Sequence, residues 1–299
     1  MEMQWGGQFE QRGLCPFVYK IIFKGEAGML RLYILDLGRM KVDSNFAEMF
    51  KNTGTYDYPD RPNTMVELPI QAFLIESDHG YMLYDTGCHA KTMTERWPEF
   101  LKTVSPWFGD ETTTPMYILD KMGIRNDEIK TIIISHMHND HAGNIEYFPK
   151  AHYMVSKNEF AACVTSYALH NMNSSYVWND IDHWIKQPID WELIEEEDGD
   201  VEVIPGVTII NLGSGHCPGV LALKVDLENT GSVILTSDAC FTKGNFENLA
   251  TPSNLYDGIG WRRSLKKLRR IAKESNATVF YGHDIEQFNT LKKAPECYD

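Results

Sequence analysis

The sequence lacks several features that would each identify a class of protein. Its six cysteines are scattered without Cys-x-x-Cys spacing, which indicates free thiols in a reducing cytosol rather than a disulfide framework. No stretch approaches the roughly 18 uncharged apolar residues that a membrane span needs. The opening MEMQWGGQFEQRG has neither the basic nor the apolar region of a secretory signal. We therefore expect a cytoplasmic protein with no membrane partner.

Positive charge is also scarce, because 28 Lys and Arg residues stand against 42 Asp and Glu residues, which gives a net charge of −14. A field of that sign repels polyphosphate, so we expect no nucleic-acid partner. Two charge runs interrupt the pattern. The acidic run 195–198 is typical of a solvated turn. The basic run within 260–275 shares a predicted helix with Trp261, Leu265 and Leu268 at helical spacing, which favours a surface helix covering a sheet over a site for an anionic partner.

Short apolar runs that resemble strands recur in both halves of the chain. These predicted strands are 17–23, 30–37, 70–77, 81–87, 131–135, 152–156, 201–212, 220–226, 232–238 and 278–284. Helices are predicted over 157–188 and 260–275. The order suits an α/β fold in which two sheets pack face to face under helices. No linker or repeat divides the chain, so we expect one domain over 1–299, with 157–188 as a helical insertion near the active site.

The most informative segment is SHMHNDHAGN (135–144), which directly follows a predicted strand. Imidazole and carboxylate groups are favoured ligands of divalent transition metals, and four of them fall within six positions. His136 and His138 lie two apart on extended backbone, which can direct both at one ion. Asp140 and His141 follow as the chain turns and can face a second ion. The segment therefore predicts a metal site.

Three later residues also follow predicted strands, where sheet proteins place open loops. His216 lies in GSGHCPG (213–219), where glycines let the backbone approach a metal closely. Asp238 ends SVILTSD and has two oxygens with which to bridge two cations. His283 ends the strand TVFYGHD. We expect Cys217 and Cys240, beside these ligands, to be packing residues, and the remaining five histidines to be core or surface residues.

The order of HxHxDH, Gly-x-His-x-Pro-Gly, a strand-ending Asp and a final Gly-His resembles the metallo-β-lactamase superfamily. Finer features are similar to its N-acyl homoserine lactonase family, from about residue 30 to residue 287. The matching segments are RLYILDLGRMKVD (31–43), LPIQAFLIES and YDTG (within 68–87), SHMHNDHAGN (135–144), SDACFTKGNFE (237–247) and FYGHDIEQ (280–287). The resemblance implies a four-layer αββα sandwich of the metallo-β-lactamase type.

The resemblance also implies a hydrolase with two divalent metal ions per chain, of which zinc is the expected element, although iron, manganese and cobalt also suit the ligands. The implied ligands of one ion are His136, His138 and His216, and those of the other are Asp140, His141 and His283. Asp238 and a hydroxide would bridge the ions. The hydroxide would attack a lactone carbonyl, and Asp140 would act as the catalytic proton shuttle to the leaving alkoxide. The implied enzyme is a quorum-quenching lactonase with a small-molecule substrate.

The sequence departs from the family where the substrate is expected. The lactonases often carry Tyr three residues after the bridging Asp, whereas this chain has Phe241, which we expect to bind substrate without a hydrogen-bond donor. Gly213-Ser214 replaces the usual Thr-Pro before Gly-His. An acyl homoserine lactone or another small lactone is the expected substrate. The alternative is a hydrolase of the same fold that acts on a thioester, cyclic amide, β-lactam or phosphodiester. A homodimer is the assembly considered.

Overall fold

The computed structural model describes residues 28–299, so the predicted strand 17–23 lies outside the described residues. The described strands form two mixed sheets. The larger has the order β4-β1-β2-β3-β5-β6-β7, and its strands are β1 Arg31–Asp43, β2 Met65–Ser77, β3 Gly80–Tyr84, β4 Trp107–Phe108, β5 Ile129–Ile133, β6 His152–Ser156 and β7 Asp190–Ile194. The smaller has the order β12-β11-β10-β9-β8, with β8 Val201–Ile204, β9 Val207–Gly213, β10 Val220–Leu227, β11 Gly231–Leu235 and β12 Thr278–Phe280.

Parallel pairing in the larger sheet determines which of its loops lie side by side. Strands β3, β5, β6 and β7 pair in parallel with one another in that order. Because parallel strands have their carboxyl ends at one edge, the segments that follow β3 and β5 emerge side by side. In the smaller sheet β11 and β12 are likewise parallel, so the segments after these two strands also lie together.

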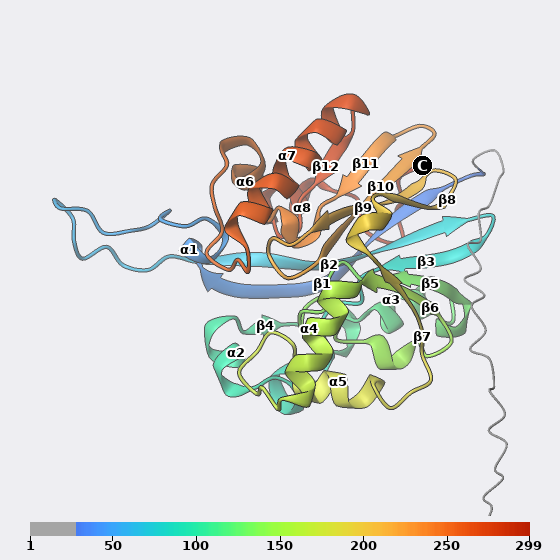
Figure 1. Cartoon of the computed structure of the whole chain (residues 1–299), viewed down its shortest axis with the longest axis horizontal. Helices are drawn as coiled ribbons and strands as arrows, with labels where there is room; N and C mark the ends of the chain where they lie inside the picture. Colours follow the sequence, from blue (N-terminus) through green and yellow to red (C-terminus); the bar gives the residue numbers. More distant parts are fainter. Residues whose placement is uncertain (1–27) are drawn as a thin grey trace, which may run out of the picture.

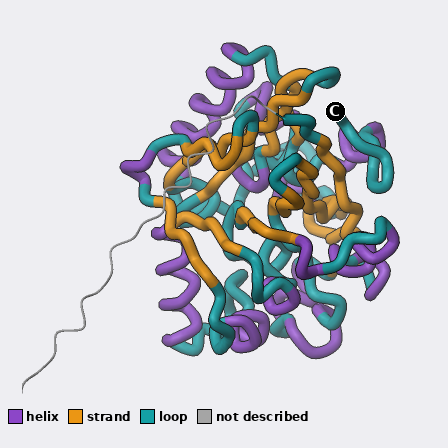
Figure 2. Tube along the Cα trace, turned by 90° about the vertical axis from the view of Figure 1, so that its right-hand side faces the viewer, coloured by secondary structure: helices purple, strands orange, loops and turns teal. Residues whose placement is uncertain are grey.

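Helices cover the outer faces of both sheets, and Figure 1 shows the resulting layers. The helices are α1 Ser44–Ala47, α2 Glu99–Val104, α3 Pro115–Lys121, α4 Lys157–Ala168, α5 Trp178–Trp184, α6 Lys243–Asn248, α7 Gly258–Glu274 and α8 Ile285–Thr290. Figure 2, turned by 90°, shows the strands between two groups of helices. The predicted α/β class and αββα layer order are confirmed. Across residues 28–299, no helix combines the length and apolar content required to cross a membrane.

Three apolar clusters match these layers. Side chains of both sheets, such as Ile34, Phe73, Leu223 and Leu235, form the core between them. In a second cluster, side chains on the outer face of the larger sheet pack against helices such as α5. In a third cluster, side chains of the smaller sheet pack against Leu268 of α7. Burial of such side chains is the main favourable contribution to folding, so the two sheets are held together by the central cluster.

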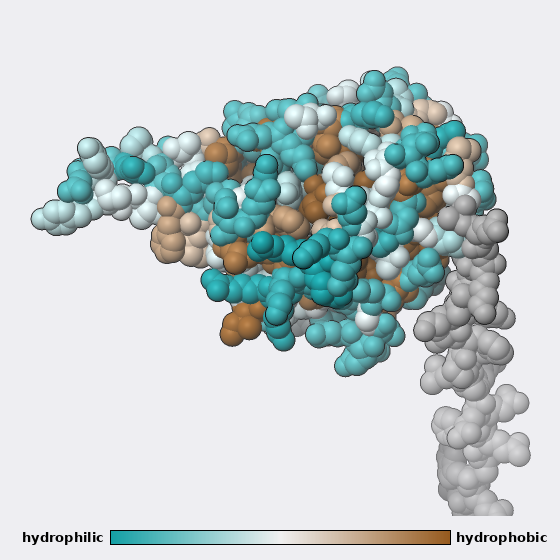
Figure 3. Space-filling view, turned by 90° about the horizontal axis from the view of Figure 1, so that it is seen from above, coloured by the Kyte–Doolittle hydropathy of each residue, from teal (hydrophilic) through white to brown (hydrophobic). Residues whose placement is uncertain are grey.

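Helix α7 has the predicted amphipathic pattern. Trp261, Leu265 and Leu268 are fully buried, whereas the basic side chains on the opposite face are exposed. The Asp257 carboxylate begins the helix by accepting hydrogen bonds from the Ile259 and Gly260 amides. Figure 3 looks onto this side of the molecule, which is largely hydrophilic, and also shows the loop after α1 projecting from the body.

Two predicted elements are divided in the structure. The helical stretch 157–188 consists of α4 and α5, separated by residues 169–177. Those residues include two asparagines and two serines, which favour turns over helix interiors. The predicted strand 201–212 is a hairpin of β8 and β9, because Pro205 cannot donate to a ladder and Gly206 adopts a φ of 84° in the turn.

Candidate metal centre

The seven predicted metal ligands come from four loops at strand ends. The first four lie in the loop that begins after β5, and the others follow β9, β11 and β12. Both sheets therefore supply ligands to one site. Six of the seven side chains are buried, and His138 is partly exposed. Metal-ligating types rarely bury together without partners, so their convergence itself indicates a shared ligand.

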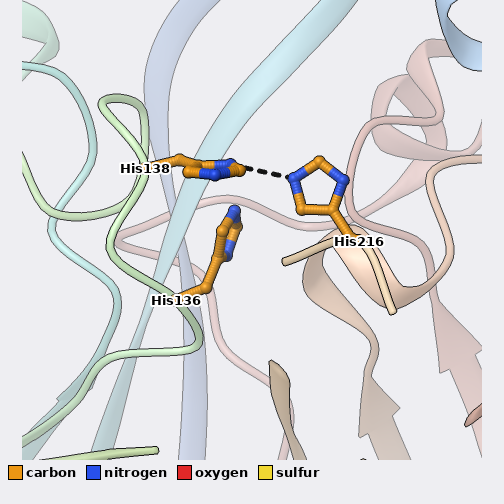
Figure 4. A group of neighbouring side chains, drawn as sticks. All are labelled: His136, His138 and His216. Carbon is orange, nitrogen blue, oxygen red and sulfur yellow. Dashed lines mark hydrogen bonds between the residues drawn. The ribbon is translucent and has the colours of Figure 1, made fainter. Parts of the chain in front are cut away.

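The side chains form three overlapping groups whose nitrogen and oxygen atoms lie within 4.8 Å of one another. The groups are His136, His138 and His216; His136, His141 and Asp238; and Asp140, His141 and His283. Figure 4 shows the first group, in which three imidazole rings from two loops point toward a common centre. Within it, Nε2 of His216 and Nδ1 of His138 lie 2.9 Å apart.

Asp238 lies between the two halves of the site and directs one oxygen to each. Its Oδ1 is 2.8 Å from Nε2 of His283 and 3.1 Å from Nε2 of His141. Its Oδ2 is 3.1 Å from Nε2 of His216 and 3.7 Å from Nε2 of His136. A carboxylate in this orientation can contact two cations at once.

Most of the histidines are oriented by a hydrogen bond from the outer ring nitrogen. Nδ1 of His216 donates to the carbonyl of Asn254 at 2.9 Å, and Nδ1 of His283 donates to the carbonyl of Pro69 at 2.9 Å. Nδ1 of His136 lies 3.0 Å from the Ser135 hydroxyl. A proton fixed on Nδ1 leaves Nε2 facing the centre, and a neutral ring in this orientation can present the Nε2 lone pair to a metal.

The donor set fits a divalent cation. Nε2 of His136 and Nε2 of His141 are buried and have no hydrogen-bond partner among the described residues. A buried nitrogen without a partner is costly, and a cation would satisfy both atoms. The imidazole and carboxylate donors suit zinc and similar transition metals.

The three-histidine half of the site favours uncharged imidazoles. Burial lowers the pKa of His136 well below its ordinary value and lowers the pKa of His138 and of His216 to about 4. Neutral rings keep the lone pairs that a cation requires, so this half is ready to bind metal at neutral pH.

The second half carries negative charge that favours a cation. Burial acts to lower the pKa of His141 and of His283, but the Asp140 and Asp238 carboxylates outweigh burial and raise both pKa values. Burial would raise the pKa of Asp238, yet the surrounding histidines hold it well below its usual range. A divalent cation replaces the protons on these histidines when it binds, so metal binding at this half releases protons.

Asp85 contacts a predicted ligand and is not among the site residues that the sequence predicts. Its Oδ2 accepts a hydrogen bond from Nδ1 of His141 at 2.8 Å and from the Ser135 hydroxyl at 2.8 Å, and its Oδ1 accepts from the Ser135 amide at 2.7 Å. Such carboxylate–histidine pairs fix the tautomer and orientation of a metal ligand. The available signal was an aspartate directly after the apolar strand β3, in the segment YDTG. Its φ of 65° is tolerated by Asp better than by most residues.

One glycine allows the second half of the site to close. A Cβ at Gly282 would collide with the carbonyl of Ser237, so only glycine lets the two segments approach this closely. Asp238 and His283 are the residues that directly follow these two positions. The short contact between their side chains depends on this backbone approach.

Phe241 is buried, with 1% of its surface exposed, and packs against two of the predicted ligands. Its ring centroid is 5.4 Å from that of His216 and 5.2 Å from that of His283, both edge-to-face, and it stacks on Phe46 at 6.0 Å. Tyr176 lies beside the other side of the three-histidine group, at 5.2 Å from His138. Two aromatic rings thus adjoin the site from different segments.

The other histidines and the cysteines take the places expected of them. Buried His89 contacts Tyr147, and His152 pairs with Asp190 and Glu192. Cys217 and Cys240 are buried and belong to none of the three ligand groups.

Comparison with known proteins bears on family and fold. A family model described as the metallo-beta-lactamase superfamily matches residues 65–283. N-acyl homoserine lactonase AiiB of Agrobacterium fabrum is 36% identical over 269 residues, which cover 89% of this chain and 98% of that protein. An N-acyl homoserine lactonase of Bacillus thuringiensis is 30% identical over 270 residues, with the same two coverages.

A solved structure gives the corresponding structural match. It is an N-acyl homoserine lactone hydrolase with the product N-hexanoyl-L-homoserine bound at its catalytic metal center. The two chains share 27% identity and a TM-score of 0.76, over 92% of this chain and 100% of the other. Sequence and structure therefore agree on the same relatives.

Proposed function

Because this chain belongs to the metallo-beta-lactamase superfamily and to its N-acyl homoserine lactonase-like family, we propose that it opens a lactone ring with two bound divalent ions, zinc in the first place. The substrate is an acyl homoserine lactone or another small lactone. Water adds to the carbonyl carbon, the ring C–O bond breaks, and the product is a hydroxy acid.

The observation that carries this proposal is the orientation of Asp238. One oxygen faces His141 and His283, while the other faces His136 and His216, so a single carboxylate adjoins two sets of donors. Each set offers enough donors for one cation, because each contains at least three side chains whose ligand atoms lie within 4.8 Å of one another.

Bound divalent ions supply an activated water at neutral pH and positive charge near the substrate carbonyl. The residues of the chain do the rest. In the proposal, His136, His138 and His216 would hold one ion, and Asp238 would offer one oxygen to each donor set. Asp140, whose carboxylate lies 3.4 Å from Nε2 of His141, is placed in the second set and passes a proton to the leaving alkoxide oxygen.

Position 241 bears on the choice of substrate. Phe241 offers an apolar ring edge to the ligands His216 and His283 and has no hydroxyl to donate to a carbonyl oxygen. Bound cations would therefore supply most of the positive charge that faces the lactone carbonyl oxygen. Position 241 therefore leaves both acyl homoserine lactones and other small lactones as candidate substrates.

The test is a substrate panel on zinc-loaded protein. Acyl homoserine lactones and simple lactones should be hydrolysed with a kcat/KM of at least about 10⁴ M⁻¹s⁻¹, the lower end for dedicated enzymes. Each product should gain the mass of one water. Thioesters, cyclic amides, β-lactams and phosphodiesters should react far more slowly. Turnover of one of these classes, with no turnover of any lactone, would retain the metal hydrolase and reject the lactonase.

The proposal includes a homodimer in the cytoplasm. The projecting loop 48–64 carries exposed Phe50, Tyr56 and Tyr58, and large exposed apolar groups favour a protein contact. The described cysteines are free thiols, which agrees with a reducing compartment. Light scattering of the purified protein checks the assembly, and a monomer at all concentrations would contradict it.

A further inference from the structure

Glu159 is a buried carboxylate behind the three-histidine half of the site. It belongs to the first turn of α4 and has no exposed surface. Charged side chains are almost never fully buried without partners, so its contacts require an explanation. Its Oε1 accepts a hydrogen bond from the Met137 amide at 2.9 Å, and its Oε2 accepts one from the Tyr176 hydroxyl at 3.1 Å. The Cys217 thiol is a further donor group close to this carboxylate.

Each of these three donors adjoins a predicted metal ligand. Met137 lies between His136 and His138 in the chain, and Cys217 directly follows His216. The Tyr176 ring packs against the His138 ring at 5.2 Å. One carboxylate therefore contacts both loops that supply the three-histidine group, as well as the aromatic ring beside it.

The backbone around Glu159 packs closely against the loop that contains His216. A Cβ at Gly219 would collide with the Ser156 side chain and would lie 3.3 Å from the Glu159 amide. Through these contacts the first residues of α4 touch Gly219, three residues after His216. The Asn139 amide also donates to the Ser175 carbonyl at 3.0 Å, which joins the loop of His138 to the segment of Tyr176.

The chemistry of the three donors calls for a carboxylate. An N–H and an O–H group donate to one side chain and an S–H group lies close to it, and an ionised carboxylate is the side chain that only accepts. A glutamine would keep one accepting oxygen and would place an NH₂ group against a donor. The substitution therefore removes part of the network while it changes the side-chain volume very little.

We propose that Glu159 is a positioning residue that holds the two loops of His138 and His216 in register and thereby sets the metal affinity of the three-histidine half of the site. This role rests on the proposed metal-dependent function, but not on the identity of the substrate. The half formed by Asp140, His141 and His283 is oriented instead by Asp85 and by the Pro69 carbonyl, so Glu159 acts on one half only.

The experiment titrates the metal-free full chain with Co²⁺ alone and follows both binding steps and the visible absorption spectrum. Glu159→Gln should weaken one of two Co²⁺ sites by about 10- to 100-fold, the usual effect of losing an outer-shell partner, and leave the other unchanged. The spectrum of the weakened site should shift. Glu197→Gln, the same chemical change on an exposed turn, serves as the control and should bind Co²⁺ as the wild type does.

Variants that remove a single donor keep the proposal testable if the Glu159→Gln protein does not fold. Tyr176→Phe and Cys217→Ala each remove one donor to the carboxylate, and each should weaken the same site less than Glu159→Gln does. Equal weakening of both sites, or a lower melting temperature with both affinities and the spectrum unchanged, would show a purely structural role and overturn the proposal. A lactone panel that fails on a chain with two normal Co²⁺ sites would reject the substrate and leave this inference standing.

Discussion

Asp238 shows how one side chain can link two halves of a site, because its two oxygens face different histidines. Asp238→Ala removes the group that contacts both donor sets. We expect activity to fall at least about 100-fold, with weaker retention of metal. Kinetics and elemental analysis of the same preparation check both effects. Asp57→Ala, in the exposed projecting loop, is the matched control. Near-normal turnover with both ions bound would mean that another residue bridges the ions.

Phe241 offers the opposite experiment, in which a group is added. Phe241→Tyr introduces the phenol that related lactonases carry, and a preorganised donor to a developing oxyanion is worth roughly 2.7–4 kcal/mol, less when a cation already stabilises it. We expect kcat/KM for acyl homoserine lactones to rise by up to about tenfold. Phe46→Tyr adds the same hydroxyl to the stacked neighbour and controls for bulk.

A loss on every lactone, with metal content unchanged, would contradict this assignment of position 241. The ring is 1% exposed, so the new hydroxyl would then be buried without a partner. Comparing kcat/KM across acyl chains of increasing length separates a missing donor from a steric clash, because a clash changes with chain length.

At the residue scale, the set of side chains that converge at the site could be predicted from the sequence, and the residues that orient them could not. Imidazoles and carboxylates at strand ends identify themselves by type and position. Asp85 and Glu159 are ordinary acidic residues in the sequence, and their roles depend on partners 56 and 22 positions away. Such pairs are created by tertiary packing, which no local spacing encodes.

At the element scale, α5 carries a buried carboxyl that makes stability depend on pH. Asp180 is 6% exposed, both oxygens lack hydrogen-bond partners among the described residues, and Arg96 is 3.6 Å away. Burial raises the pKa of Asp180 to about 8, and Arg96 opposes the rise only in part. The folded chain therefore keeps a proton that the unfolded chain releases above about pH 4. The stability that this proton provides is complete below pH 4 and is lost as the pH rises to 8.

Asp180→Asn removes this loss. We expect the difference in free energy of unfolding, variant minus wild type, to increase as pH rises. The limiting slope of this difference is about 1.4 kcal/mol per pH unit. Urea unfolding of zinc-saturated protein from pH 5 to pH 9 measures it. Asp182→Asn on the same helix is the control, because hydrogen bonds from Lys186 and Tyr167 lower the pKa of Asp182. Parallel curves for Asp180→Asn and wild type would show that Asp180 does not titrate in this range.

Element boundaries were predicted less well than element types. Most strands of both sheets are visible in the sequence as apolar runs, whereas β7 and the two-residue β4, Trp107–Phe108, are not among the predicted strands. The pairing of β4 with Arg39 and Met40 of β1 is a long-range contact, and two residues are too few for a periodic pattern. The division of 157–188 into α4 and α5 has a local cause in the asparagines and serines between the two helices.

At the scale of the whole molecule, the site requires both sheets, since the larger sheet supplies the loop of His136 and the smaller supplies His216, Asp238 and His283. We expect two metal ions per chain in carefully loaded protein, measured by elemental analysis. Because ions bind the folded chain far better than the unfolded one, loading should also raise the melting temperature. One tight ion per chain, with no second binding step, would reject the dinuclear arrangement.

The order of the ligands along the chain has a consequence for synthesis on the ribosome. The HxHxDH loop emerges first, His216 and Asp238 follow, and His283 comes from the last strand of the smaller sheet. A nascent chain therefore displays four ligand groups long before it can enclose an ion. Tight metal capture has to wait until the smaller sheet docks onto the larger one. The folded chain then takes up ions that are exchangeable in the cell, so growth conditions during expression should influence which metal it carries.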